Sequence, residues 1–253
     1  MSTDVVQPEA EDDRRPLVGQ RIALVDDAAG VSELVARWLE HELGVVVDVF
    51  GDAATFIATP PPLGEWQLAL VDLSFPQSEV DGLDILLHLQ RNSPGTLRVL
   101  FTQGDDFVSE QLRDAWEAVP LATVLSKSMP MADLAKVIVQ VVRTGSAPID
   151  PVIRPLLPDE RSPWRSAESY ARLIQHAGHA KLWRALIQFD GEPSYRDLSR
   201  ATGLSVNTVR NYREQLLGEL RLHGLESPTM RVMQTFACRC RSFLAPLIAE
   251  RLD

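Results

Sequence analysis

The chain has 253 residues, of which 45% are hydrophobic and 24% are charged, and its formal net charge is −10. This composition is ordinary for a globular protein, and the length suffices for one large domain or two small ones. No apolar run reaches the roughly 18 residues that a membrane-spanning helix needs, so we expect no membrane association.

The charge is distributed unevenly along the chain. Residues 1–150 hold 10 Lys/Arg against 24 Asp/Glu, whereas residues 151–253 hold 15 against 11. This asymmetry predicts two domains with different partners, and it makes the basic second half a candidate for binding nucleic acid.

Both the first residues and the cysteines favour an intracellular protein. Residues 1–19 are polar and acidic and lack the apolar segment of a secretory signal, so we expect a disordered tail there. Cys238 and Cys240 are the only cysteines, and their spacing is too tight for an easy disulfide. We therefore expect a cytoplasmic location.

Strand-like and helix-like segments alternate through the first half. The strand-like runs are 21–26, 45–50, 66–72, 97–102 and 121–126, and the helix-like segments are 32–43, 82–91, 108–118 and 131–142. Such alternation predicts an α/β domain with a parallel sheet covered by helices on both faces.

Polar side chains stand where four of these strands end. They are Asp26 and Asp27 after the first strand, Asp72 after the third, Thr102 at the end of the fourth and Lys127 after the fifth. The carboxyl ends of the strands of an open parallel sheet form its ligand crevice, so we expect these groups to converge on one small site.

The carboxylates in this set suit a divalent metal. Mg²⁺ prefers hard oxygen ligands and keeps several waters, so we expect Asp27 and Asp72 to bind it directly. A third ligand is expected from a backbone carbonyl just after Asp72, that of Ser74. Asp26 would act through a bridging water.

The same set suits a phosphoryl group. The Asp72 carboxylate can serve as a nucleophile and form an acyl phosphate. Thr102 would then donate to one phosphoryl oxygen, and the Lys127 ammonium would pair with another.

Five stretches of the first half resemble the receiver domain of bacterial two-component response regulators. They are 22–27, 70–76, 81–84, 100–102 and 124–127. Over residues 20–143, the resemblance implies a flavodoxin-like, doubly wound sheet of five parallel strands in the order 2-1-3-4-5. It also implies Mg²⁺-dependent phosphotransfer from a sensor histidine kinase to Asp72. The face between about 108 and 142 is where this family usually dimerises or holds its effector.

The pattern stops after residue 143. Residues 144–164 are rich in proline, which predicts a semi-extended linker, and the apolar residues within it suggest that part of it docks on a neighbour. Residues 165–253 lack strand patterns and predict helices at 166–176, 180–189, 195–202, 206–222 and 230–248, with a break near Pro246.

The segment from residue 195 to residue 213 has the pattern of a helix-turn-helix. Gly203 permits a sharp turn, and Ser205 can cap the helix that follows it. The polar and basic residues left on the outer surface of that helix are Asn207, Thr208, Arg210, Asn211 and Arg213. We expect Arg210 to contact base edges, the two asparagines to read adenine edges, and the remaining two residues to bind phosphates.

Residues 182–222 resemble the LuxR/NarL-type helix-turn-helix of response regulators, most closely at 206–210, although a winged or another subtype is also compatible with the pattern. The two resemblances together imply a transcription factor rather than an enzyme. It would be phosphorylated on Asp72 by a histidine kinase and would bind double-stranded DNA as a homodimer.

Two alternatives stay open. Gln103 and Val124 depart from the receiver pattern, which favours a regulator that binds DNA without phosphorylation and uses its first domain as a dimerisation platform. A haloacid-dehalogenase-like phosphohydrolase also uses an aspartate at a strand end, Mg²⁺ and a lysine. That class normally has a second aspartate two residues after the nucleophile, where this chain has Ser74.

Overall fold

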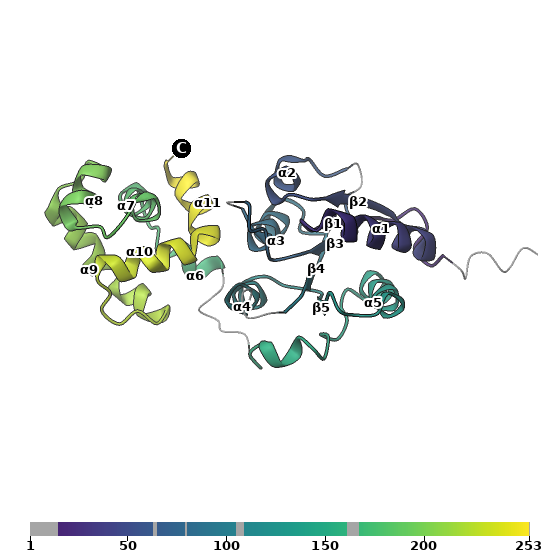
Figure 1. Ribbon diagram of the computed structural model, residues 1–253. Coiled ribbons are helices and arrows are strands. Elements are labelled where there is room, and N and C mark those ends of the chain that lie inside the picture. The colour runs from purple at the N-terminus through teal and green to yellow at the C-terminus, as the bar shows by residue number, and fades with distance from the viewer. Residues whose placement is uncertain (1–14, 63–64, 79, 105–108, 161–166, 253) are drawn as a thin grey trace, which may run out of the picture. The chain divides into compact units, whose positions relative to one another are not determined.

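The computed structural model describes residues 15–62, 65–78, 80–104, 109–160 and 167–252 (Figure 1). Its contacts divide the chain into two compact units, with the main boundary between residues 159 and 160 and with residues 117–119 assigned to the second unit. The first unit is an α/β sheet domain, and the second is built from helices alone in the part that the structure describes.

The first unit contains five strands and the helices between them. In chain order they are β1 (Arg21–Val25), α1 (Ala29–Leu43), β2 (Val46–Phe50), α2 (Ala53–Ala58), β3 (Leu68–Val71), α3 (Gly82–Asn92), β4 (Leu97–Thr102), α4 (Ser109–Ala118), β5 (Thr123–Ser126), α5 (Met131–Thr144) and the 3₁₀ turn η1 (Arg154–Leu156).

The five strands form one parallel sheet in the order β2-β1-β3-β4-β5. This confirms the α/β fold class and the strand order that the resemblance implied. The strand order reverses between β1 and β3, where Val25 pairs with Val71, so the residues that follow these two strands emerge side by side. Thr102 likewise pairs with Ser126, so the residues that follow β4 and β5 also emerge side by side.

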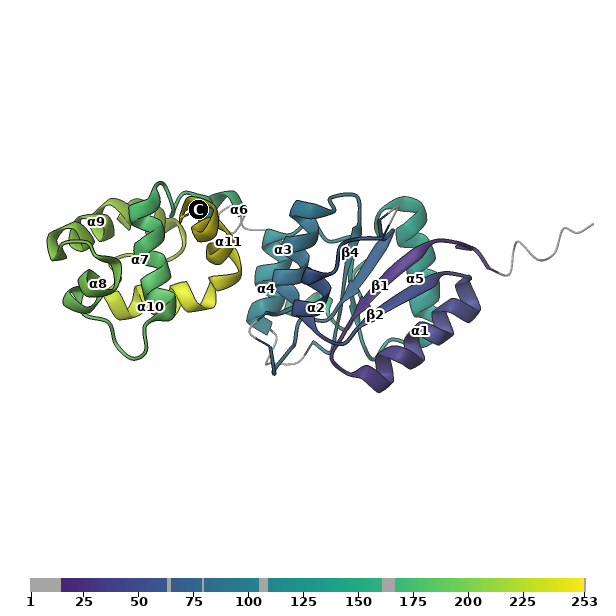
Figure 2. The ribbon, with the colours of Figure 1, turned by 90° about the horizontal axis from the view of Figure 1, so that it is seen from above.

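Helices cover both faces of the sheet. In Figure 2, α1 and α5 lie on one face, while α2, α3 and α4 lie on the other. The core on the α1 and α5 side is made of fully buried aliphatic residues, among them Leu24, Leu39, Leu70 and Ile138. Burial on both faces explains why β3 is apolar along its whole length, rather than alternating, and why all four residues of β5 are buried.

The first unit begins earlier and ends later than the sequence predicts. Within the expected tail of residues 1–19, residues 1–14 lie outside the described part, but Leu17 is buried and its amide donates to the Leu43 carbonyl at 3.0 Å. At the other end, residues 145–159 belong to this unit. The segment 144–164 therefore differs from the predicted linker over residues 144–159, and 161–164 lie outside the described residues.

The second unit contains six helices in its described part. They are α6 (Ala167–Ala171), α7 (Ala177–Gln188), α8 (Tyr195–Thr202), α9 (Val206–Leu222), α10 (Met230–Arg239) and α11 (Arg241–Leu252). Helices α10 and α11 both pack on α7. The core includes Trp183, whose indole N–H donates to the Leu173 carbonyl at 2.8 Å.

Several helix boundaries in the second unit differ from the predicted ones. The helix predicted over 166–176 ends at Ala171, and the next begins at Ala177 because the His176 side chain caps it, accepting from the amides of Gly178 and His179. The last predicted helix breaks at Cys240 rather than near Pro246, which lies inside α11.

Candidate functional site

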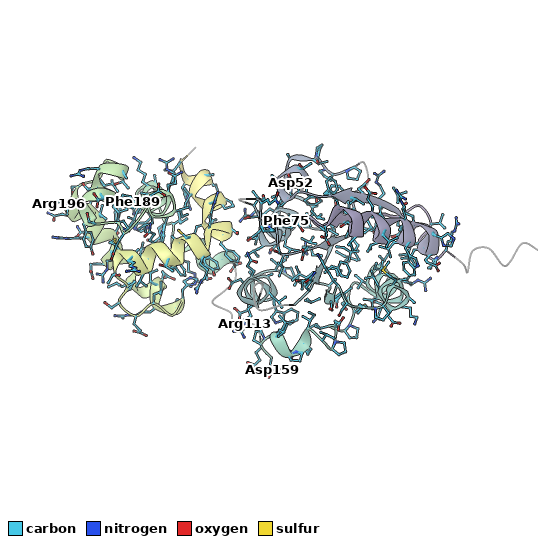
Figure 3. All side chains as sticks on the ribbon, in the orientation of Figure 1. Asp52, Phe75, Arg113, Asp159, Phe189 and Arg196 are labelled. Atoms are coloured by element: carbon cyan, nitrogen blue, oxygen red, sulfur yellow. The ribbon has the colours of Figure 1, made fainter. Side chains whose placement is uncertain are left out.

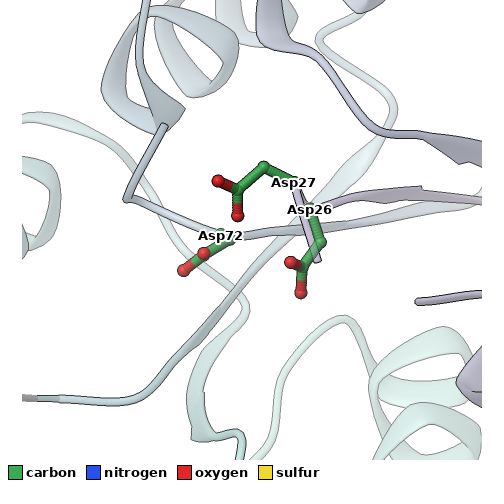
Figure 4. A group of neighbouring side chains, drawn as sticks. All are labelled: Asp26, Asp27 and Asp72. Carbon is green, nitrogen blue, oxygen red and sulfur yellow. The ribbon is translucent and has the colours of Figure 1, made fainter. Parts of the chain in front are cut away.

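Three carboxylates meet at the carboxyl edge of the sheet. Asp26 and Asp27 follow β1, Asp72 follows β3, and one oxygen from each lies within 4.8 Å of the others (Figure 4). Asp26 and Asp72 are 3% and 5% exposed, whereas Asp27 faces solvent. The predicted convergence of these carboxylates is therefore present in the structure, as a group that could hold a metal ion.

Lys127 joins this group from the end of β5. Its Nζ lies 2.7 Å from Asp26 Oδ2 and 2.8 Å from Asp72 Oδ2, and only 15% of its side chain is exposed. Burial alone would lower the Lys127 pKa, but the hydrogen bonds to the two carboxylates outweigh it and raise the pKa. The ammonium is thus charged and compensates the buried acidic pair.

Asp72 is desolvated yet well supplied with donors. Burial raises its pKa above the ordinary value, and the nearby Lys127 only partly offsets this. The other Asp72 oxygen, Oδ1, accepts from the amide of Leu73 at 2.8 Å. The local backbone and Lys127 therefore fix the orientation of this carboxylate.

Asp26 uses both of its oxygens within the protein. Oδ1 accepts from the amide of Ala28 at 2.9 Å, and Oδ2 pairs with Lys127. The Ala28 carbonyl in turn accepts from the Ser32 hydroxyl at 3.0 Å, which ties the start of α1 to the cluster. Asp26 therefore has less free coordinating capacity than exposed Asp27.

Thr102 completes the set from the end of β4. It is 1% exposed; its hydroxyl accepts from the Gly104 amide at 3.5 Å, and its carbonyl accepts from the Lys127 amide at 2.9 Å. A cavity of about 200 Å³ joins it to the carboxylates, lined by Asp27, Ala28, Asp72, Ser74, Pro76, Thr102, Gln103 and Lys127. Every residue predicted for the phosphoryl site lines this cavity or, as Asp26 does, pairs with a residue that lines it.

Gly82 is a residue of this site that the sequence analysis missed. A Cβ built on it would lie 1.9 Å from the Asp72 carbonyl oxygen and 2.7 Å from the Leu73 Cα. Only glycine therefore allows the first turn of α3 to approach the backbone of Asp72 and Leu73 so closely. A glycine directly after a helix-capping aspartate was the available signal in the sequence.

The residue before Gly82 links two helices next to this site. Asp81 caps α3 by accepting from the amides of Leu83 and Asp84, and its Oδ2 accepts from the Gln111 side-chain amide of α4 at 3.0 Å. Burial, and then the neighbouring Asp84 carboxylate, raises the pKa of Asp81 to about 6.

The second unit contains the predicted helix-turn-helix. A capping box of Ser194 and Asp197 starts α8, Gly203 ends it in the left-handed conformation with φ 70°, and Ser205 caps α9 by accepting from the Thr208 amide. On the inner side of α9, Val209, Leu216 and Leu220 are all fully buried.

Three of the five predicted DNA contacts lie exposed on α9. They are Asn207, Arg210 and Asn211. The Arg210 guanidinium lies 5.3 Å from the centroid of the Tyr195 ring at the start of α8. Arg196, the neighbour of Tyr195, is also exposed and is labelled in Figure 3. These side chains give the two helices a polar and basic outer surface.

Arg213 differs from its predicted place on the outer surface. Its side chain is only 16% exposed, its Nε donates to the Pro228 carbonyl at 2.8 Å, and its Nη1 pairs with Glu214. Arg213 therefore ties α9 to the chain before α10. The Thr208 hydroxyl lies 2.8 Å from that of Ser205, within the cap of α9.

No protein-family model matches this chain, and no curated protein matches it. Similar solved structures include two RcsB dimers bound to two parallel DNAs (16% identity, 86% of this chain, 96% of that chain, TM-score 0.46). The response regulator ChrA of a heme-sensing two-component system is 18% identical over 91% of this chain and 100% of its own, with a TM-score of 0.45. A LuxR-family two-component response regulator from Aurantimonas sp. is 24% identical over 53% of this chain and 92% of its own, with a TM-score of 0.43.

These likenesses are distant, and the fold of the first unit rests on its own sheet order. Among the helices of the described residues, none combines the length and the apolar character that crossing a membrane requires.

Proposed function

We propose that this chain is a response regulator of a two-component system, acting in the cytoplasm. Asp72 accepts a phosphoryl group from a sensor histidine kinase, and the helical unit binds double-stranded DNA. The observation that carries the proposal is the Lys127 ammonium between Asp26 and Asp72, at 2.7 and 2.8 Å, with the Thr102 hydroxyl on the wall of the same cavity. This set supplies an acceptor carboxylate and two partners for phosphoryl oxygens.

The side chains that this chain would contribute to the transfer are already close together. An Asp72 oxygen forms a bond to phosphorus while the phosphorus–nitrogen bond of the phosphohistidine donor breaks. The Lys127 ammonium, which donates to Asp72 Oδ2 in the structure, then pairs with a phosphoryl oxygen instead. The Thr102 hydroxyl donates to another phosphoryl oxygen. Because these partners are largely buried, their charges are screened little by water.

The acidic group fits Mg²⁺, which is bound by hard oxygen ligands. Asp27 and Asp72 would hold it directly together with the Ser74 carbonyl. Asp26 would act through a bridging water, because its oxygens already serve Ala28 and Lys127. The bound ion supplies positive charge that neutralises the acceptor and the incoming phosphoryl oxygens.

The DNA-binding part of the proposal is supported by α9. Its exposed side chains include a guanidinium and two amides, which are the groups that read purine edges in the major groove. A dimer would place two such helices one DNA turn apart. The phosphorylation-independent alternative keeps the same DNA contacts and is favoured by Gln103, whose exposed side chain lines the phosphoryl cavity.

The acceptor assignment is tested by acetyl-phosphate labelling of the full chain with Mg²⁺, read by intact mass spectrometry. The wild type is expected to gain one phosphoryl group and Asp72→Asn none, because an amide is not a nucleophile for phosphorus. Asp27→Asn is expected to be labelled more slowly, since it removes a carboxylate that would bind the metal.

Asp133→Asn is the matched control. Asp133 is an exposed aspartate on α5 that pairs only with Lys136 among the described residues, so its labelling should equal that of the wild type. Stoichiometric labelling of Asp72→Asn would contradict the assignment. Steady phosphatase turnover by the wild type, without accumulation of a phosphorylated chain, would favour the phosphohydrolase class instead.

A further inference from the structure

The chain does not leave the sheet after α5. Residues 147–157, here called the β5 strap, turn back along the open edge of β5. The Ala147 amide donates to the Ala122 carbonyl at 3.1 Å, the Asp150 amide donates to the Val124 carbonyl at 2.9 Å, and the Thr123 hydroxyl donates to the Pro148 carbonyl at 2.8 Å. The strap therefore pairs with backbone groups that an edge strand otherwise presents to solvent.

Asp150 fixes the strap to the strand end that carries Lys127. It is 5% exposed, and its Oδ2 accepts from the Ser126 amide at 3.1 Å. Its Oδ1 accepts from the Val152 amide at 2.8 Å, and its carbonyl accepts from Ile153 and Arg154. One buried carboxylate thus shapes the turn of the strap and holds the residue just before Lys127.

Ile153 brings the strap against the loop that follows Thr102. Its side chain is fully buried. A Cβ built on Gly104 would lie only 2.5 Å from the Ile153 Cδ1. Gly104 has a φ of +71°, and its amide donates to the Thr102 hydroxyl. Ile153 therefore packs on the residue that is hydrogen-bonded to the Thr102 hydroxyl.

We propose that the β5 strap changes its conformation when Asp72 is phosphorylated. This change is transmitted along the chain toward residue 160, where the second unit begins. A phosphoryl group on Asp72 draws the Thr102 hydroxyl and the Lys127 ammonium toward it, and each of these residues has a strap contact within two positions, at Gly104 and at Ser126. When Thr102 moves, the hydrogen bond from the Gly104 amide to its hydroxyl breaks, and Ile153 packs differently against Gly104. Movement of Lys127 pulls on the Ser126 amide that Asp150 holds.

This inference rests on the proposed function. Hydrogen exchange of the full chain can show whether the inference fails alone or together with the proposed function. Exchange is compared in Mg²⁺ alone and in Mg²⁺ with beryllofluoride, a phosphoryl mimic. The amides of Asp150, Ile153 and Arg154 are expected to change their exchange rates by about fivefold or more, as is typical of coupled sites. A response at Asp72 and Thr102 with an unchanged strap overturns the inference alone. No response anywhere overturns the proposed function and the inference with it.

Side-chain variants test whether the strap transmits the signal or only covers β5. The readout is the ratio of affinities for a fluorescein-labelled DNA duplex, selected from random sequence, with and without beryllofluoride. Ile153→Ala is expected to bring this ratio close to one while beryllofluoride still protects the amides near Asp72. Val152→Ala is the matched control, because Val152 is the neighbouring residue and is 62% exposed.

Two further variants guard against a simple loss of stability. Ile153→Val keeps most of the buried side chain and is expected to restore the ratio. Asp150→Asn keeps the side-chain volume, weakens acceptance from the Ser126 and Val152 amides, and is expected to reduce the ratio. An unchanged ratio in both Ile153→Ala and Asp150→Asn, or an equal loss in Val152→Ala, overturns the proposal.

Discussion

Lys127 is the residue whose partners depend most directly on the state of Asp72. It is shared between Asp26 and Asp72, so two largely buried negative charges are balanced by a single ammonium. Removing the ammonium would leave these carboxylates uncompensated, which is costly in a desolvated site. A phosphoryl group on Asp72 would give the ammonium a more strongly charged partner than the carboxylate. We propose that this exchange of ion pairs starts the conformational change of the β5 strap.

Arg210 is held in a second kind of contact, above the ring of Tyr195. A cation over an aromatic face at an exposed site is stabilised by about 0.5–1 kcal/mol. Because the ring belongs to α8 and the guanidinium to α9, the contact restricts Arg210 in the free chain, before the DNA binding that we propose. Less side-chain freedom is then lost on binding.

Tyr195→Ala is therefore expected to weaken DNA binding by about two- to fivefold, the factor that corresponds to this contact energy. Tyr195→Phe is the control, since it keeps the ring and removes only the hydroxyl. Fluorescence anisotropy at one fixed salt concentration measures both. If Tyr195→Phe loses as much affinity as Tyr195→Ala, the hydroxyl rather than the ring is responsible, and the positioning role is wrong.

Single residues differ in how far the sequence predicts them. Asp26 and Asp72 could be placed because each ends an apolar run, and a parallel sheet brings such ends together without further information. Arg213 could not, because helical periodicity does not reveal that the chain near Pro228 covers that part of α9. The need for glycine at position 82 likewise arises only once α3 is seen against the Asp72 carbonyl.

At the level of elements, Asp81 joins the start of α3 to α4. Its pKa of about 6 means that, between about pH 4 and pH 6, the folded chain keeps a proton that the unfolded chain releases. The free energy of unfolding therefore falls as the pH rises through this window, because the unfolded state binds fewer protons there than the folded state. A rise of about two pKa units corresponds to at most about 3 kcal/mol.

Asp81→Asn is expected to remove this part of the pH dependence. Asparagine caps helices as well as aspartate does, so the cap is kept while the charge is lost. Urea unfolding of the first unit at a series of pH values measures the effect against the wild type, with exposed Asp133→Asn as a control. Identical pH profiles for Asp81→Asn and the wild type would show that Asp81 does not titrate in this window.

The elements that the sequence misses have short or unusual patterns. The strands were predictable because continuous apolar runs mark burial on both faces. Helix α2 is only six residues long, too short for a helical period to appear. The β5 strap contains several prolines, which favoured a linker, yet the amides of Ala147 and Asp150 pair with the chain at β5, and Ile153 and Leu157 are buried.

On the scale of the whole molecule, the charge asymmetry coincides with the two functions that we propose, phosphorylation in the first unit and DNA binding in the second. The acidic half of the chain contains the carboxylates that we propose bind Mg²⁺, and the basic half contains α9. A negative first unit and a basic second unit suit a metal with a phosphoryl group and a polyanion, respectively. The division into two units follows from the contacts within each of them.

The most direct test measures the DNA affinity of the full chain with and without beryllofluoride and Mg²⁺, for the wild type and for Asp72→Ala, at one fixed salt concentration. We predict that beryllofluoride strengthens binding by the wild type by about fivefold or more and leaves Asp72→Ala unchanged. Equal affinities for both proteins, with and without the mimic, would contradict phosphorylation control and favour a regulator that binds DNA independently of Asp72.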